Sequence, residues 1–305
     1  MNIERAFIVK HLHVPDRLYK YRQFTANHLD ALNQNTLWMS SPDRFNDPND
    51  AAVSFDTDRF FIEDQSAQDF IASSKEFMNA ANSGGNWQPK KLISPVQQGE
   101  WRRKVIIDLL KDMDFPNKDQ FFRVLDEIMK RHAAEDVRRM SAGFRRGFSV
   151  LSLSENYSSN LMWSHYSDSH RGFVIEYDFS KLHYSDLRRR LCFPVFYTKK
   201  LRDATRYLAR TDMSDFNNLF GQYMCLIKQS AWEYEKEWRI ILAIGPSHAN
   251  RELEMPVPSA IILGSQVKQA DEDTMRALCY ARKIPLKRMA QRPGSFDLDV
   301  QDVIS

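Results

Sequence analysis

The stretch Glu233-Tyr234-Glu235-Lys236-Glu237-Trp238-Arg239-Ile240-Ile241-Leu242 carries three carboxylates at the entrance of an apolar segment. Residues 238–244 are rich in β-branched and aromatic side chains, which predicts a buried strand. A period of two then places Glu235, Glu237 and Arg239 on one face. Two interpretations are open. Either this is a solvated strand end in which Arg239 pairs with its neighbours, or the carboxylates polarise a ligand or accept a proton.

Segments on both sides of this stretch also have strand or helix patterns. Strands are predicted at residues 17–22, 37–40, 148–154, 172–178, 193–197, 260–264 and 287–290. Thr25 predicts an N-cap for a helix over residues 26–32, and further helices are predicted at 161–166, 212–230 and 271–282. The last of these lies between two strands and predicts a β-α-β unit.

The pattern changes to helical between about residue 57 and residue 147. We therefore expect an α+β fold with a mixed, largely antiparallel sheet core. Residues 1–56 and 148–305 would form the sheet-containing core domain, and residues 57–147 a helical insertion or cap.

Composition narrows the class of protein. The chain has 305 residues, 43% of them hydrophobic, and a net charge of only +3, so no global field demands a polyanionic partner. The three cysteines are widely spaced and predict reduced, packed thiols. The start of the sequence lacks a signal-peptide core, and no run approaches the roughly 18 apolar residues of a membrane span. We expect a cytoplasmic protein without a membrane partner.

Residues 163–172 concentrate imidazole, phenol, hydroxyl and carboxylate groups in front of a predicted strand. One interpretation is ligand recognition, with Trp163 or Tyr166 stacking and His165 or His170 donating a hydrogen bond. The other is a buried polar network that ties a helix to the sheet. The sequence contains no His-Glu-x-x-His pattern, and we predict no metal site.

Ser152 and Ser154 are two positions apart on a predicted strand and therefore share a face. A Gly-x-Ser-x-Gly elbow is absent, which argues against a nucleophilic serine. Glycine-rich phosphate loops are absent too, so a bound phosphate would have to meet Arg22, Lys20 or a helix N-terminus. Arg22 has an alternative role as a structural ion-pair partner.

Four sequence blocks, taken together, resemble a widespread bacterial family of unknown function. They are Leu18-Tyr19-Lys20-Tyr21-Arg22, Ser40-Ser41-Pro42-Asp43-Arg44-Phe45-Asn46-Asp47-Pro48, Met162-Trp163-Ser164-His165-Tyr166 with His170-Arg171-Gly172, and Trp232-Glu233-Tyr234-Glu235-Lys236-Glu237-Trp238-Arg239. The blocks follow the family's order. This resemblance implies that the four segments meet in space.

The order of Arg22, Ser152-Leu153-Ser154 and Glu235-Lys236-Glu237 is also similar to that of ADP-ribosyltransferases of the Arg/Ser/Glu type. That similarity implies that Arg22 holds the pyrophosphate of NAD and that Ser152 orients the site. It also implies that Glu237 stabilises an oxocarbenium-like ribose as nicotinamide leaves, while Glu235 activates the acceptor.

Three hypotheses follow for function. The first is an ADP-ribosyltransferase-like or other NAD- or nucleotide-processing enzyme, acting on a nucleic acid or protein acceptor or as a bacterial defence or toxin effector, with NAD as substrate. The alternative is a non-catalytic nucleotide or nucleic-acid binding module, and the third is a metal-dependent hydrolase. We assign to the site, for chemistry, Glu237, Glu235 and His165, and for substrate binding Arg22, Tyr21, Ser41, Asn46, Asp47, Ser152, Ser154, Trp163, Tyr166, His170 and Arg239.

Overall fold

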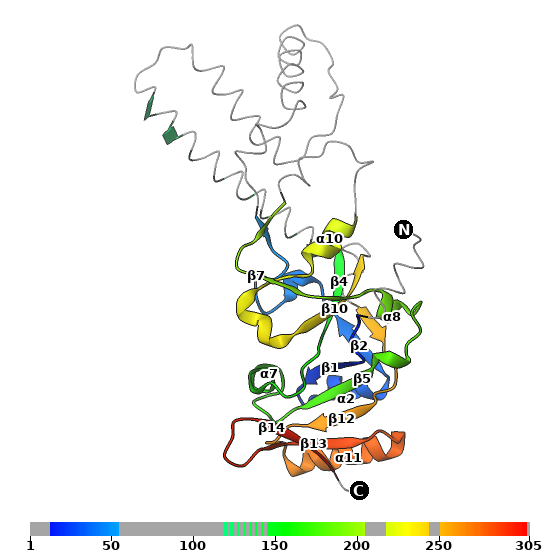
Figure 1. The fold of residues 1–305 in the computed structure, drawn as a ribbon. Coiled ribbons are helices and arrows are strands. Elements are labelled where there is room, and N and C mark those ends of the chain that lie inside the picture. The colour runs from blue at the N-terminus through cyan, green and yellow to red at the C-terminus, as the bar shows by residue number, and fades with distance from the viewer. Residues whose placement is uncertain are drawn as a thin grey trace. The chain divides into compact units, whose positions relative to one another are not determined.

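A computed structural model describes residues 13–54, 145–204, 218–243 and 251–303, together with isolated positions between residues 119 and 142. Residues 1–51, 145–200 and 222–305 form one compact unit, and residues 52–144 and 201–221 form a second (Figure 1). In the second unit, β3 (Val53–Ser54) pairs in parallel with β8 (Arg202–Asp203). The predicted helical insertion at 57–147 lies largely outside the described residues, and its described positions between 119 and 142 are helical.

An eight-stranded sheet organises the first unit, in the order β14-β13-β12-β5-β1-β4-β10-β6. Its strands are β1 (Arg17–Arg22), β4 (Phe148–Ser154), β5 (Phe173–Asp178), β6 (Cys192–Pro194), β10 (Glu237–Ala243), β12 (Ala260–Leu263), β13 (Leu286–Gln291) and β14 (Leu298–Asp302). Neighbours are antiparallel except β12 and β13, which helix α11 (Gln269–Arg282) joins as a β-α-β unit. This confirms the predicted α+β class with a mixed, largely antiparallel sheet.

The described residues also form shorter elements. They are helices α2 (Ala26–Asn33), α7 (Asn160–Tyr166), α8 (Leu187–Arg190) and α10 (Asn218–Met224), 3-10 helices η1 (Pro42–Arg44), η2 (Phe179–Lys181) and η4 (Ser230–Glu235), and the strand pairs β2 (Thr36–Met39) with β11 (Arg251–Glu254) and β7 (Phe196–Thr198) with β9 (Ile227–Gln229). Thr25 caps α2 as predicted, because its side chain accepts a hydrogen bond from the backbone N–H of His28.

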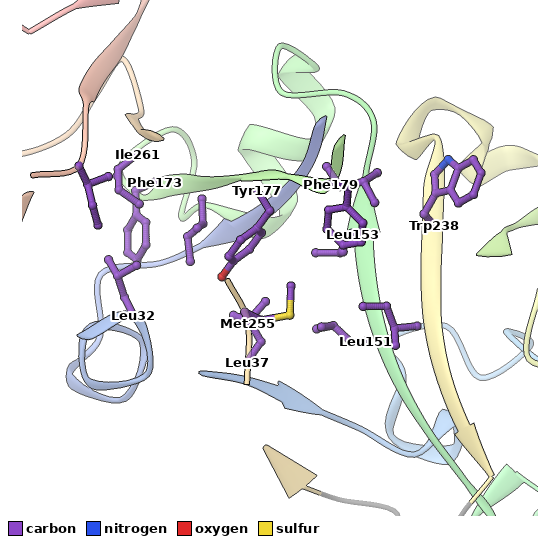
Figure 2. Close-up of a cluster of buried hydrophobic side chains, with 14 of the residues drawn as sticks. Leu32, Leu37, Leu151, Leu153, Phe173, Tyr177, Phe179, Trp238, Met255 and Ile261 are labelled. Carbon is purple, nitrogen blue, oxygen red and sulfur yellow. The ribbon is translucent and has the colours of Figure 1, made fainter. Parts of the chain in front are cut away.

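The main hydrophobic core lies on one face of the sheet. Figure 2 shows Phe173 and Tyr177 of β5 and Leu153 of β4 on the same side as Leu32 of α2 and Leu37 of β2. The opposite face of β1 carries Tyr19 and Tyr21, which pack with Trp163 of α7. Alternating residues of β1 and β4 therefore belong to different faces, a fact that decides which side chains can meet at the site.

Two predicted elements are wrong in detail. The single strand expected at 193–197 is two strands in different sheets, β6 and β7, because the chain switches partners at Val195. The Val195 N–H donates to Glu237 O (2.9 Å), and the next N–H, that of Phe196, donates to Leu226 O (2.7 Å). The helix expected to continue to residue 230 ends at Met224, and β9 and η4 follow. Strands β11 and β14 had no predicted counterpart.

The three cysteines, Cys192, Cys225 and Cys279, are buried and free, which confirms the packed thiols expected from their spacing. Within the described segments, every helix is too short or too polar to cross a lipid bilayer.

Candidate functional site

The strands of the sheet bring the predicted serines and the acidic motif together. Strands β4 and β10 pair in register, so that Glu237 lies opposite Ser154 and Arg239 lies opposite Ser152. Paired residues of a sheet share a face, and the predicted grouping of these side chains is therefore realised. Ser154 Oγ also donates to Glu235 O (2.6 Å), which holds the end of η4 against the strand.

The acidic motif is not a solvated strand end, because Glu235, Glu237 and Arg239 belong to a buried charge network. Its other members are Asp50 and Lys228, and all five residues are between 1% and 5% exposed. Arg239 reaches Glu237 through Nε (2.8 Å) and Asp50 through Nη2 (2.6 Å). Lys228 Nζ bridges Glu235 Oε2 (2.5 Å) and Glu237 Oε2 (2.9 Å). Apart from a hydrogen bond with the Ser152 side chain, the Glu237 carboxylate thus contacts cations inside the protein.

This network contains three carboxylates and two cations, and so carries one excess negative charge when every group is ionised. The excess falls on Glu235. Burial and the negative charge of Glu237 raise its pKa above the ordinary value, against the opposing effect of Lys228. Burial alone would also raise the pKa of Glu237, but the charges of Arg239 and Lys228 reverse this and lower it to about 2. Two neighbouring carboxylates whose pKa values are pushed apart are suited to different roles: Glu237 as a fixed charge and Glu235 as a proton carrier.

Tyr166 of α7 contacts the carboxylate that is free to titrate. Its hydroxyl donates to Glu235 Oε1 at 2.6 Å and accepts a longer bond from Asn46 Nδ2 at 3.3 Å. Burial and the charge of Glu235 raise the pKa of Tyr166, so the phenol stays protonated and remains a donor. Residues from three of the predicted motifs, Asn46, Tyr166 and Glu235, therefore form one chain of hydrogen bonds.

A cavity of about 910 Å³ lies beside this chain and is lined by residues of β1, α2, β2, β4, α7, β9, η4 and β10. Its cationic part is formed by Lys20 and Arg22, beside His28, whose pKa is lowered mainly by burial. Burial, followed by repulsion from Arg22, lowers the pKa of Lys20 to about 7, and burial lowers that of Arg22 to about 10. Among the described residues, the Arg22 guanidinium has no hydrogen-bond or ion-pair partner. A partly buried cation without a protein partner is the kind of group that an anionic ligand would satisfy.

Arg22 and Glu237 line the same cavity, but their side chains leave the sheet on opposite faces. Arg22 pairs with Phe173 of the main core, whereas Glu237 pairs with Ser154, which shares the face of Tyr19. Strand β1 pairs with β5 along its full length but with β4 at one position, Tyr19 opposite Ser154. Beyond that pair Lys20 Nζ donates to Ser152 O (2.6 Å) in place of a backbone ladder. The cavity reaches both faces past this point, since its lining includes residues of α2 and of α7.

The remaining assigned residues divide into two groups. Tyr21 and His165 line the cavity, although the Tyr21 hydroxyl already donates to Asn156 O (2.8 Å). Trp163, His170, Ser41 and Asp47 are outside its lining and make internal contacts. Trp163 is buried and donates through Nε1 to Tyr157 O (2.7 Å), and His170 stacks on it with ring centroids 6.1 Å apart.

The loop residues Ser41 and Asp47 form hydrogen bonds with other groups of the protein. Ser41 donates a hydrogen bond to Asp43, and Asp47 accepts bonds from Trp232 Nε1 (3.0 Å) and the backbone N–H of Asn49 (2.8 Å). In the described part of the chain, no group of three or more His, Cys, Asp or Glu side chains is arranged to hold a metal ion. The third hypothesis, a metal-dependent hydrolase, therefore gains no support from His165, His170 or Asp47.

Sequence reasoning missed Lys228, Asp50, His28 and Trp38. Lys228 lies in a segment that was predicted to be helical but forms strand β9. The predicted helix gave no reason to expect Lys228 next to Glu235. Residues 224–228 are all buried in the structure, so the short strand β9 carries no alternating pattern that could have revealed it. Asp50 lies 189 positions from Arg239 and had no local signal.

The buried carboxylate of Glu237 makes the free energy of unfolding depend on pH. Its pKa falls from the ordinary 4.5 to about 2 on folding, so its contribution is fully present above pH 4.5 and is lost as the pH falls toward 2. We expect Glu237→Gln to lower the free energy of unfolding at pH 7 by an amount on the order of 3 kcal/mol, and this penalty to shrink steadily as the pH falls from 4.5 toward 2. Urea unfolding followed by tryptophan fluorescence measures it. Exposed Glu233→Gln is the control, and a penalty independent of pH would contradict the prediction.

Comparison with known proteins identifies a family for part of the chain. Residues 162–240 match the model of a family described as "Protein of unknown function (DUF2971)". The matched segment includes Tyr166, Lys228, Glu235, Glu237 and the greater part of α7. The comparisons with curated proteins and with solved structures found no match. The segment that supplies the acidic half of the site is therefore similar to a domain of unknown function.

Proposed function

We propose that the protein is an enzyme that binds NAD or a related nucleotide in the cavity and cleaves its N-glycosidic bond, by transfer to an acceptor or to water. The observation that carries the proposal is the uneven charge of the cavity. An unpaired cation, Arg22, lies at one part of its wall, and a buried network with an excess negative charge lies at another. A nucleotide has the complementary arrangement, with anionic phosphates and a ribose that becomes positive as its base leaves.

The cationic part of the cavity suits the phosphates. Arg22 would hold phosphate oxygens, and Lys20 and His28 lie beside it in the cavity lining. Trp38 also lines the cavity and is 50% exposed, which offers an aromatic face for a base. The volume of about 910 Å³ is within the range of nucleotide-sized ligand sites.

The chemistry is assigned to Glu235 rather than Glu237. When the C–N bond to nicotinamide breaks, its electron pair stays with the leaving ring and C1′ of the ribose becomes oxocarbenium-like. The attacking hydroxyl forms the new bond to C1′ and transfers its proton to Glu235, which Tyr166 holds in place. Glu237 keeps Lys228 and Arg239 in position. The excess negative charge of the network then stabilises the positive charge that develops on the ribose.

A direct test is to incubate the protein with NAD, with and without protein and nucleic-acid acceptors, and to measure free nicotinamide. We expect release by the wild-type chain and a fall of about 10²- to 10⁴-fold in rate for Glu235→Gln, because Gln preserves the shape of the side chain but accepts no proton. Glu233→Gln is the matched control, since Glu233 is an exposed residue of the same 3-10 helix. Equal rates for the two variants would contradict the role of Glu235.

The non-catalytic binding module is the alternative outcome of this experiment. NAD binding without nicotinamide release, with the same affinity in wild type and Glu235→Gln, would replace the enzyme by a nucleotide sensor. Transfer of the ADP-ribose to water, with release of nicotinamide, would instead deplete NAD, the activity expected of a toxin or defence effector.

A further inference from the structure

We propose that Lys20 is a nucleophilic amine that forms an imine with an aldehyde or ketone whose phosphate is held by Arg22. The proposal does not depend on glycosidic cleavage, and it assigns to β1 a covalent chemistry that the acidic network does not perform.

The position of Lys20 is the first argument. Lys20 lines the cavity, and its Nζ donates to a main-chain carbonyl, Ser152 O (2.6 Å), while no carboxylate of the described residues comes within ion-pair distance of it. The buried carboxylates of this cavity, Asp50, Glu235 and Glu237, are already paired with Lys228 and Arg239. An amine that a carboxylate does not hold can present its lone pair to a ligand, and the bond to Ser152 O fixes its direction.

The charges around Lys20 are the second argument, because they favour the neutral amine. The groups that face it are Arg22 on its own strand, His28 on α2, Lys228 on β9, Glu235 on η4 and Glu237 on β10. The two carboxylates favour the ammonium form, but burial and the adjacent Arg22 outweigh them and bring the pKa of Lys20 to about 7. A desolvated lysine next to another cation is the general arrangement of amines that react with carbonyl compounds at neutral pH.

The identity of the ligand follows from Arg22. Alternate residues of a strand share a face, so Arg22 and Lys20 point to the same side of β1. Arg22 has no protein partner among the described residues and suits a phosphate. A small phosphorylated carbonyl compound would place its phosphate at Arg22 and its carbonyl carbon at Lys20. The amine nitrogen then forms the bond to carbon, and the carbonyl oxygen leaves as water with the two amine protons.

Two measurements on the wild-type chain test the amine itself. Limited acetylation with acetic anhydride at several pH values, followed by peptide mass spectrometry, gives a rate for each lysine. We expect Lys20 to react at pH 7 about tenfold faster than exposed Lys236, and to reach half of its maximal rate near pH 7, since ordinary exposed amines are almost fully protonated there. A Lys20 rate no higher than that of Lys236 at pH 7 would overturn the proposal.

The carbonyl chemistry is tested with pyridoxal 5′-phosphate and borohydride, which reduces an imine to a stable secondary amine. We expect the label on Lys20 in the wild type, its loss in Lys20→Arg, and at least about fivefold less label with pyridoxal, which lacks the phosphate. Arg22→Gln should remove the advantage of the phosphorylated probe without abolishing acetylation of Lys20. Label spread equally over surface lysines would refute the imine. Label on Lys20 without nicotinamide release would uphold it while rejecting the glycosidic reaction.

Discussion

Arg239→Met is expected to destabilise the first unit by about 3–5 kcal/mol, the range found when one partner of a buried ion pair is removed. Methionine fills a similar volume, so the loss is one of charge. Without the guanidinium, Asp50 loses both of its bonds to Arg239, and Glu237 keeps Lys228 as its one cationic partner among the described residues. Three buried carboxylates would then share one cation. Chemical unfolding followed by tryptophan fluorescence should show a midpoint well below that of the wild type.

The control for this prediction is Arg292→Met, which removes an arginine from an exposed pair with Asp299. Its unfolding midpoint should not change measurably, because exposed pairs contribute little. Arg239→Lys should fall between the two, since an ammonium carries the charge but does not reproduce the fork that reaches both carboxylates. If Arg239→Met were as stable as Arg292→Met, the buried network would not be what holds these strands together.

Most of the sheet was predictable because its strands carry their own signals. The apolar or alternating runs at β1 and β4 match the predicted strands at both ends, and the β-α-β unit after residue 260 matches in order. The errors are at β6, β7 and β9. These short strands are defined by partners far along the chain, such as Glu237 O for Val195 and Leu226 O for Phe196, rather than by their own patterns.

The sequence predicted several residues of the site but not the role of each one. The sequence placed Glu235 and Glu237 in one motif and Tyr166 in another. In the structure, the Tyr166 hydroxyl donates a hydrogen bond to Glu235. The sequence could not reveal that Lys228 and Asp50 belong to the network around the acidic motif, because the partner of Arg239 lies 189 positions away and Lys228 was assigned to a helix. The choice between Glu235 and Glu237 depends on Arg239 and Lys228, because their charges together keep Glu237 ionised at low pH.

The side chains of β1 alternate between the two faces of the sheet. This limits how closely the site can match the arrangement that the resemblance to Arg/Ser/Glu transferases implies. The three elements do lie on adjacent strands, β1, β4 and β10. Arg22, however, faces the main core, and Lys20 is the cation that bridges to β4. A ligand that contacted both Arg22 and Glu235 would therefore have to extend past the point where β1 and β4 separate. The elongated shape of a dinucleotide is compatible with that path.

Gly172→Ala is the second change expected to have a large effect, because β5 passes too close to the end of β1 for any side chain. A Cβ atom at Gly172 would lie 2.1 Å from Arg22 O and 3.0 Å from two backbone atoms of Ser167. These are backbone atoms, so relief requires a shift of the strand that carries Arg22. We expect a loss of about 3 kcal/mol or more in the free energy of unfolding.

Gly294→Ala is the matched control for this prediction. Gly294 has a φ of +72°, and no atom of its surroundings lies within 4 Å of the place that a Cβ would take, so alanine there meets backbone strain without a clash. Its cost should be only about 1 kcal/mol. The clash at Gly172 also has a functional consequence that a general loss of stability lacks. At a temperature where Gly172→Ala remains folded, the shift of Arg22 should weaken binding of NAD and lower labelling by pyridoxal 5′-phosphate, while Gly294→Ala binds normally. Normal binding and stability in Gly172→Ala would show that β1 and β5 can separate at Arg22, and that its position is not fixed by this contact.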